Sequence, residues 1–183
     1  MREELRDLLS HIENCLKCYE DFKEYSDEDR VKIRQWYNKS PWFFPPHGEV
    51  KGFLGTGEAM FVCQRPSTQP GTFPRGNSLR FYELLKEFGL EDSHLTDLVK
   101  CRGLVGKLTE EEINNCLPHL IDEIAILKPK VIVAVGNEVF KVLSKHLPEE
   151  NVVKMPHYAP RYKPEDFAEV LGEKLKEIKE VRF

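Results

Sequence analysis

The chain has 183 residues, of which 40% are hydrophobic and 32% charged, and its formal net charge is −4. This length suits one domain with its own core, and the acidic total excludes binding to nucleic acid through bulk charge, so such binding needs a local basic patch. No run approaches the roughly 18 apolar residues of a membrane helix, and the first residues lack an apolar signal region. We expect a soluble, cytoplasmic protein that does not bind membranes.

The five cysteines indicate a metal centre. An odd number of cysteines in a chain without a secretion signal favours metal ligation or free thiols over disulfides. Four of them form two pairs: Cys15 and Cys18, spaced C-x2-C, and Cys101 and Cys116. Four thiolates suit either zinc or an iron–sulfur cluster, and their spacing does not choose between these groups. The fifth, Cys63, is expected to be a small buried residue.

The first third of the chain predicts helices and a loop rather than strands. Residues 2–14 have apolar positions at helical spacing and lead into the C-x2-C pair. Residues 27–38 predict a second helix, with Ser26 as its N-cap. Residues 40–57 are rich in proline, glycine and aromatic residues, and we expect a long loop there.

From residue 58 onwards the patterns of strand and helix alternate. The expected strands are residues 58–64, 94–99, 130–135 and 152–155. The expected helices are residues 78–88, 109–127, 137–146 and 164–179. Thr109 and Glu112 form a capping-box pattern, and Asn77 or Ser78 is the expected cap of the earlier helix. The alternation predicts an α/β fold, a three-layer αβα sandwich around a mostly parallel sheet of about four strands.

A proline-rich loop follows the first strand. Residues 65–78 contain three prolines and two glycines, so they cannot be regular structure. Because they lie between a buried strand and a helix, they occupy the position where open α/β sheets bind ligands. Basic residues near this loop and near residue 160 are candidates for contacts with DNA phosphates: Arg65, Arg75, Arg80, Arg161 and Lys163.

These motifs resemble the iron–sulfur branch, called family 4, of the uracil-DNA glycosylase superfamily. The resemblance covers nearly the whole chain apart from residues 20–50. It is most specific at VKCRG (residues 99–103) and at the run from EEINNC to VIVAVG that follows. It also rests on these residues: Cys15 and Cys18, Met60-Phe61-Val62 with Pro66, Phe73, and His157 in MPHYAPRY.

The resemblance implies a DNA glycosylase of base excision repair that binds DNA and acts as a monomer. It implies one domain over residues 1–183, with an N-terminal arm that helps to bind a [4Fe-4S] cluster through Cys15, Cys18, Cys101 and Cys116. It also implies roles in the pocket. Phe73 would stack on a flipped-out base, Asp97 would read the base edge, and Pro66 would line the base site. His157 would stabilise the leaving base, and Gln64 would stand near the catalytic position of the first motif. Phe73 could instead be a core aromatic residue, and His157 could only cap backbone groups.

Two positions depart from the family pattern. The first family motif is Gly-Glu-Ala-Pro-Gly with acidic residues soon after, but this chain has Cys-Gln-Arg-Pro-Ser at residues 63–67 and lacks the acid. The family reads the base with Asn, whose amide donates to uracil O4 and accepts from N3–H, whereas an ionised Asp97 can only accept. Asp97 would then suit a base with a donor, such as cytosine, or it would position the attacking water instead.

Two hypotheses about function follow. The protein excises a deaminated or otherwise altered base, uracil or a related one, or it is a catalytically silent iron–sulfur protein that binds DNA with the same fold. An enzyme acting on a small nucleoside is a third reading, favoured only if the basic residues do not form a groove.

Overall fold

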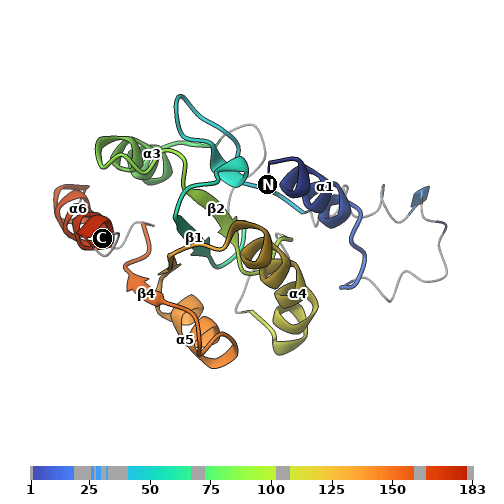
Figure 1. The fold of residues 1–183 in the computed structure, drawn as a ribbon. Coiled ribbons are helices and arrows are strands. Elements are labelled where there is room, and N and C mark those ends of the chain that lie inside the picture. The colour runs from blue at the N-terminus through green and yellow to red at the C-terminus, as the bar shows by residue number, and fades with distance from the viewer. Residues whose placement is uncertain are drawn as a thin grey trace.

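A computed structural model describes residues 2–18, 26, 28–29, 32, 41–66, 73–101, 108–158 and 164–180, with only the backbone described for 164–168. The helices are α1 (Arg2–Glu13), the 3-10 helix η2 (Gly52–Leu54), α3 (Asn77–Glu87), α4 (Glu110–Leu127), α5 (Asn137–His146) and α6 (Pro164–Glu180) (Figure 1). The strands are β1 (Ala59–Cys63), β2 (His94–Asp97), β3 (Val131–Val135) and β4 (Val152–Met155). No helix in these ranges is long and apolar enough to cross a membrane.

The four strands form one parallel sheet in the order β2-β1-β3-β4. The two inner strands, β1 and β3, are buried at every position, as their unbroken apolar runs predict. Cys63 at the end of β1 lies opposite Asp97 at the end of β2. Because all strands run in one direction, their carboxyl ends meet at one edge, which is where open α/β sheets bind ligands.

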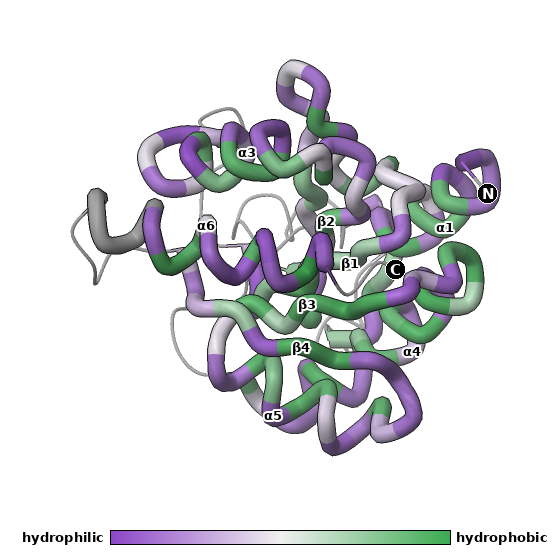
Figure 2. Tube along the Cα trace, turned by 60° about the vertical axis from the view of Figure 1, so that its left-hand side comes forward, coloured by the Kyte–Doolittle hydropathy of each residue, from purple (hydrophilic) through white to green (hydrophobic). Residues whose placement is uncertain are grey.

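Helices cover both faces of the sheet, which confirms the three-layer sandwich (Figure 1). On one face, α3 and α6 pack against the sheet through Phe81, Tyr82, Leu85, Leu171 and Leu175. On the other, α4 and α5 pack through Ile113, Leu120, Ile124, Val139 and Leu143. Figure 2 shows the hydrophobic residues of β3 running through the middle of the molecule, with hydrophilic residues gathered on the outer helices. The α1 helix lies against α4, outside the two main layers.

The predicted start of α4 is confirmed, and the predicted cap of α3 is wrong. The Glu112 N–H donates to Thr109 Oγ1 at 3.1 Å, and the Thr109 N–H donates to Glu112 Oε2 at 2.9 Å, which completes a capping box. The N-cap of α3 is Gly76, at φ 54°, with no side-chain hydrogen bond. Ser78 lies inside the helix, where its hydroxyl donates to the Arg75 carbonyl at 2.7 Å, so the hydroxyl closes a turn instead of capping.

The segment over residues 41–56 is irregular, as expected, but it contributes to the core. Phe44, Val50 and Phe53 are almost fully buried. The Trp42 N–H donates to the Lys100 carbonyl at 3.0 Å, which ties this segment to the chain beside Cys101. The helix predicted over residues 27–38 lies mostly outside the described residues; within them, the Asp29 N–H donates to Ser26 Oγ at 3.2 Å.

Candidate active site and cysteine centre

Asp97 ends β2 at the carboxyl edge of the sheet. Its side chain is 3% exposed, and neither carboxyl oxygen has a hydrogen-bond partner among the residues that the structure describes. Burial raises the pKa of Asp97 to about 8; Lys100 and Arg65 oppose this rise, and Glu123 adds to it. Parallel pairing brings the residue here, because Leu98 continues the ladder by donating to the Cys63 carbonyl at 2.7 Å.

A buried ionic network lies behind Asp97, on the side towards α4. Lys100 Nζ lies 2.6 Å from Glu123 Oε1, and His94 Nε2 lies 3.1 Å from Glu123 Oε2. Lys100 Nζ also donates to Thr96 Oγ1 at 2.7 Å and to the main-chain oxygen of Asp97 at 2.6 Å. Lys100 therefore fixes the backbone at the end of β2 without contacting the Asp97 carboxyl group.

His157 follows β4 and lies at the same edge. It lines a pocket with Gln64, Gly136 and Glu138, and burial lowers its pKa, which favours the neutral ring at neutral pH. Gly136 adopts φ 101°, and a Cβ there would lie 3.6 Å from His157 Cβ. This glycine lets the chain turn from β3 into α5 directly beside the imidazole.

Glu138 was not among the residues predicted from the sequence. It lies in the first turn of α5, and Gln64 Nε2 donates to its Oε2 at 2.5 Å. The pair joins the end of β1 to the start of α5 at the mouth of the pocket that His157 lines. The signal that could have found it is an acidic residue two positions after the glycine that ends a buried strand, because such residues lie at the carboxyl edge.

Phe73 belongs to a group of aromatic rings on the α3 side of the sheet. Its ring centroid lies 4.9 Å from that of Trp42, 5.6 Å from Phe44 and 5.5 Å from Tyr82, all edge to face. Tyr82 is close enough to Asp97 for the carboxylate to raise its pKa, after the larger effect of burial. Phe73 is half-buried, so it is held by its neighbours but not enclosed, and Pro66 is buried.

The predicted basic residues differ in their surroundings. Arg65 is 10% exposed, and its Nη2 lies 2.7 Å from Glu112 Oε2. Arg80 lies 2.8 Å from Glu87 and 3.4 Å from Glu83, whereas Arg75 is exposed. Arg161 and Lys163 lie outside the described residues. Two of the arginines thus have their charge balanced within the protein.

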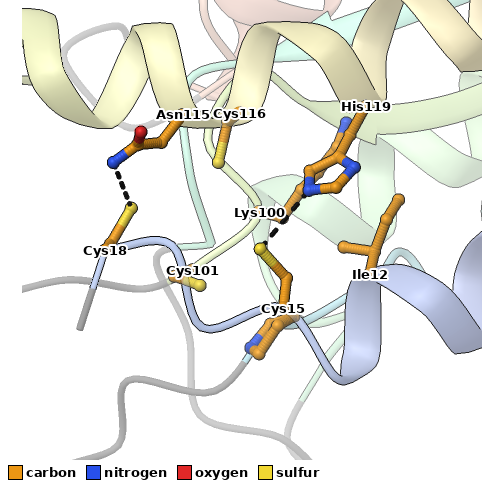
Figure 3. A pocket seen from close by; sticks show the side chains of 9 residues that line it. Ile12, Cys15, Cys18, Lys100, Cys101, Asn115, Cys116 and His119 are labelled. Carbon is orange, nitrogen blue, oxygen red and sulfur yellow. Dashed lines mark hydrogen bonds between the residues drawn. The ribbon is translucent and has the colours of Figure 1, made fainter. Parts of the chain in front are cut away.

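Four cysteines from distant parts of the chain line one cavity (Figure 3). Cys15 and Cys18 follow α1, Cys101 follows β2, and Cys116 lies in α4. The other lining residues among those that the structure describes are Ile12, Pro41, Lys100, Asn115 and His119. The structure thus places all four predicted ligand cysteines around one cavity, and their role as ligands stays a prediction.

The contact between Cys18 and Cys116 shifts their pKa values in opposite directions: it lowers that of Cys18 and, together with burial, raises that of Cys116. A hydrogen bond from Cys116, opposed by burial and helped by Asn115, lowers the pKa of Cys18 to about 6. Asn115 Nδ2 lies 3.5 Å from Cys18 Sγ, and His119 Nε2 lies 3.4 Å from Cys15 Sγ (Figure 3). Soft thiolate donors of this kind suit zinc and iron–sulfur groups.

The sulfur atoms surround the cavity without converging on one point. Within the described part of the chain, no three His, Cys, Asp or Glu side chains are gathered closely enough to hold a single metal ion. Zinc draws its sulfur ligands to about 2.3 Å, whereas an iron–sulfur cluster inserts several irons and sulfides between its cysteines. The donor set is therefore chemically suitable, but it is not drawn together as a formed ligand shell.

A parallel sheet between two helical layers defines an α/β protein, and the candidate site residues lie at the carboxyl edge of its sheet. Residues 55–176 match the profile of the uracil DNA glycosylase superfamily, and the chain belongs to that superfamily. The chain is 36% identical over 96 residues to the type-4 uracil-DNA glycosylase of Pyrobaculum aerophilum. That match covers 50% of this chain and 48% of the relative, so the chain matches about half the length of that protein.

Proposed function

We propose that the protein is a DNA glycosylase that hydrolyses the N-glycosidic bond of a deaminated or otherwise altered base, uracil or a related one, in base excision repair. The observation that carries this proposal is that His157 and the Gln64–Glu138 pair line one pocket at the carboxyl edge of the sheet, and that Asp97 ends a strand at the same edge, in a member of this superfamily. Such a site can meet the needs of the reaction, which are a reader for the flipped base, a donor to the leaving base and a group that places water.

Asp97 and Phe73 are the residues that we assign to base recognition. The carboxyl group of Asp97 stands at the end of a strand, and its buried oxygens have no hydrogen-bond partner among the described residues, so we assign them to pairing with a base edge. Phe73 offers a half-buried ring for stacking, and its neighbours Trp42 and Tyr82 hold that ring in place. Pro66 is the third residue of this base site.

His157 is the residue that we assign to the leaving base. Hydrolysis leaves negative charge on the departing base, and a ring N–H can donate a hydrogen bond to it. The lowered pKa of His157 keeps the imidazole neutral, so it acts by hydrogen bonding and does not need to transfer a proton. Gly136 beneath the ring keeps this side of the pocket open.

Glu138 supplies the acid that the first family motif lacks in this chain. Its carboxylate accepts from Gln64 Nε2, which leaves its other oxygen to orient an attacking water beside His157. A carboxylate also stabilises the cationic sugar that forms as the bond breaks. With Glu138 in this role, Asp97 serves as the base reader and not as the water-positioning residue.

The partner of this site is DNA, and the protein acts as a cytoplasmic monomer. Arg75 is exposed beside α3 and is the described residue best placed to contact a phosphate. Arg161 and Lys163 are proposed for the same role. Arg65 has its charge balanced by Glu112, so its contribution to DNA binding is the smallest of the four.

The cofactor that we propose is a [4Fe-4S] cluster held by Cys15, Cys18, Cys101 and Cys116. Four thiols around one cavity fit this group better than zinc, because among the described residues the sulfurs line a cavity and do not meet at a single point. When bound, the cluster supplies four metal–sulfur bonds that fasten the N-terminal arm to α4. Residues 1–183 then form one glycosylase domain with a cluster-binding arm.

A panel of oligonucleotides tests this function. Each duplex carries one uracil, hypoxanthine, xanthine or mismatched normal base, and alkali then cleaves any abasic site. We expect strand cleavage at uracil or a related base, and its loss with His157→Ala. Binding of every duplex without cleavage would identify a silent DNA-binding protein instead.

A further inference from the structure

We propose that Asp97 reads the base as a neutral carboxylic acid, so that it presents one O–H donor and one C=O acceptor to a base edge in which a carbonyl adjoins a ring N–H. Uracil and hypoxanthine carry this edge. The inference rests on the proposed function and specifies its substrate class. It also replaces the expectation that an ionised Asp97 would favour a base such as cytosine.

The surroundings of the carboxyl group favour its neutral form. Asp97 is 3% exposed, and within the described residues neither of its oxygens accepts or donates a hydrogen bond. A charged carboxylate in such a place would be both desolvated and unpaired, which is among the most costly arrangements in a protein interior. A protonated carboxyl group avoids that cost.

The nearest ammonium group is engaged by other partners and makes no hydrogen bond to this carboxyl group among the described residues. Lys100 has three N–H donors, and it makes three contacts: Glu123 Oε1 at 2.6 Å, Thr96 Oγ1 at 2.7 Å and the Asp97 main-chain oxygen at 2.6 Å. The charge of Lys100 is thereby matched by Glu123. Arg65 pairs with Glu112 at 2.7 Å, so it does not neutralise Asp97 either.

Apart from Lys100 and Arg65, the titratable groups around Asp97 do not favour its ionisation. The titratable and charged groups that face it are Cys63, Arg65, Tyr82, Lys100, Glu123 and Tyr158. Burial raises the pKa of Cys63, Tyr82 and Tyr158, which keeps all three neutral. Glu123 is the nearby anion: burial opposes its ionisation, but Lys100 and His94 hold its pKa below the usual value. The result is a pKa for Asp97 of about 8.

A neutral carboxyl group offers the same pattern as an amide. Its O–H donates as the amide NH2 does, and its C=O accepts as the amide oxygen does. The O–H therefore meets uracil O4, and the C=O meets N3–H. An ionised carboxylate loses the donor and places negative charge against O4, so uracil recognition ends as Asp97 ionises. A protonated Asp that donates a hydrogen bond from an apolar site is an established catalytic device.

The test compares the wild-type protein with Asp97→Asn from pH 6 to 10. Single-turnover uracil release by the wild type is expected to be constant below about pH 7 and to fall tenfold per pH unit above about pH 8. Release by Asp97→Asn, which cannot ionise there, is expected to stay level. Equal pH profiles for the two proteins would overturn the inference.

A second measurement does not depend on catalysis. In protein labelled with ¹³C at aspartate carboxyl carbons, the Asp97 signal is identified by its absence in Asp97→Asn, and it should titrate near pH 8. Titration below pH 5 would overturn the inference even if uracil is released. If neither protein releases any base at any pH, the proposed function fails, and the base-reading role fails with it.

Discussion

Asp97 also makes the stability of the fold depend on pH. Its pKa rises from 3.8 to about 8 on folding, so the folded state holds the proton more tightly than the unfolded chain. The resulting stability is fully present below about pH 4 and is lost as pH rises through 8. Asp97→Asn has no charge to bury. The melting temperature of this variant minus that of the wild type should therefore increase between pH 5 and pH 9. Thermal unfolding followed by circular dichroism measures the gap, and parallel curves would show that Asp97 is ionised in the folded protein.

At the residue scale, Glu138 is the side chain that we propose to position the attacking water. Glu138→Gln keeps the shape and the contact with Gln64 but removes the charge, so we expect single-turnover release of uracil to fall by about 10²-fold, the scale of a lost general base. DNA affinity should stay unchanged. Glu149→Gln, on an exposed turn after α5, is the matched control. Full activity of Glu138→Gln would show that another group positions the attacking water.

At the scale of elements, the segment over residues 41–56 holds Phe73, the residue that we assign to base stacking. Trp42 and Phe44 from this segment hold the Phe73 ring edge to face, and Trp42 is tied to the chain beside Cys101. The placement of Phe73 therefore depends on a segment that precedes it in sequence.

Phe73 tests this arrangement. Phe73→Ala should weaken binding to DNA with an unstacked uracil by about 1–3 kcal/mol, because it removes base stacking. Phe73→Leu keeps apolar packing against Trp42 without an aromatic face, so it should lose the same affinity but keep the melting temperature. If Phe73→Leu binds like the wild type, the ring serves the core and not the base. Fluorescence anisotropy with a labelled duplex measures both variants.

The sequence was sufficient for elements whose signal is local. The β3 run and the Thr109–Glu112 capping box carry their own patterns, and the structure has both. The sequence prediction of the N-cap was wrong at the start of α3. Ser78 has a good capping side chain, but Gly76 has the backbone conformation that the turn needs. Glu138 was missed for a different reason: its partner Gln64 is 74 residues away, and only the sheet brings the two together.

At the scale of the whole molecule, the cysteine centre brings the segment after α1 together with α4 and the chain after β2. Cys101→Ser should abolish cluster binding and lower the melting temperature, because metal binding and folding are coupled. Anaerobically purified wild type should hold about four irons per chain. Cys63→Ala, which removes a buried thiol outside the cavity, should keep its iron. Metal analysis measures the iron and zinc content of each protein. Wild-type protein with only zinc would contradict the iron–sulfur assignment.

Direct detection of the released base tests the central claim, that the carboxyl edge of the sheet excises a base from DNA. The wild type and the double variant Glu138→Gln/His157→Ala are incubated at pH 7 with a duplex containing one uracil, and free uracil is quantified by mass spectrometry. The account predicts one free uracil per duplex with the wild type and none above background with the variant. Tight binding of the duplex by the wild type without any free base would contradict it.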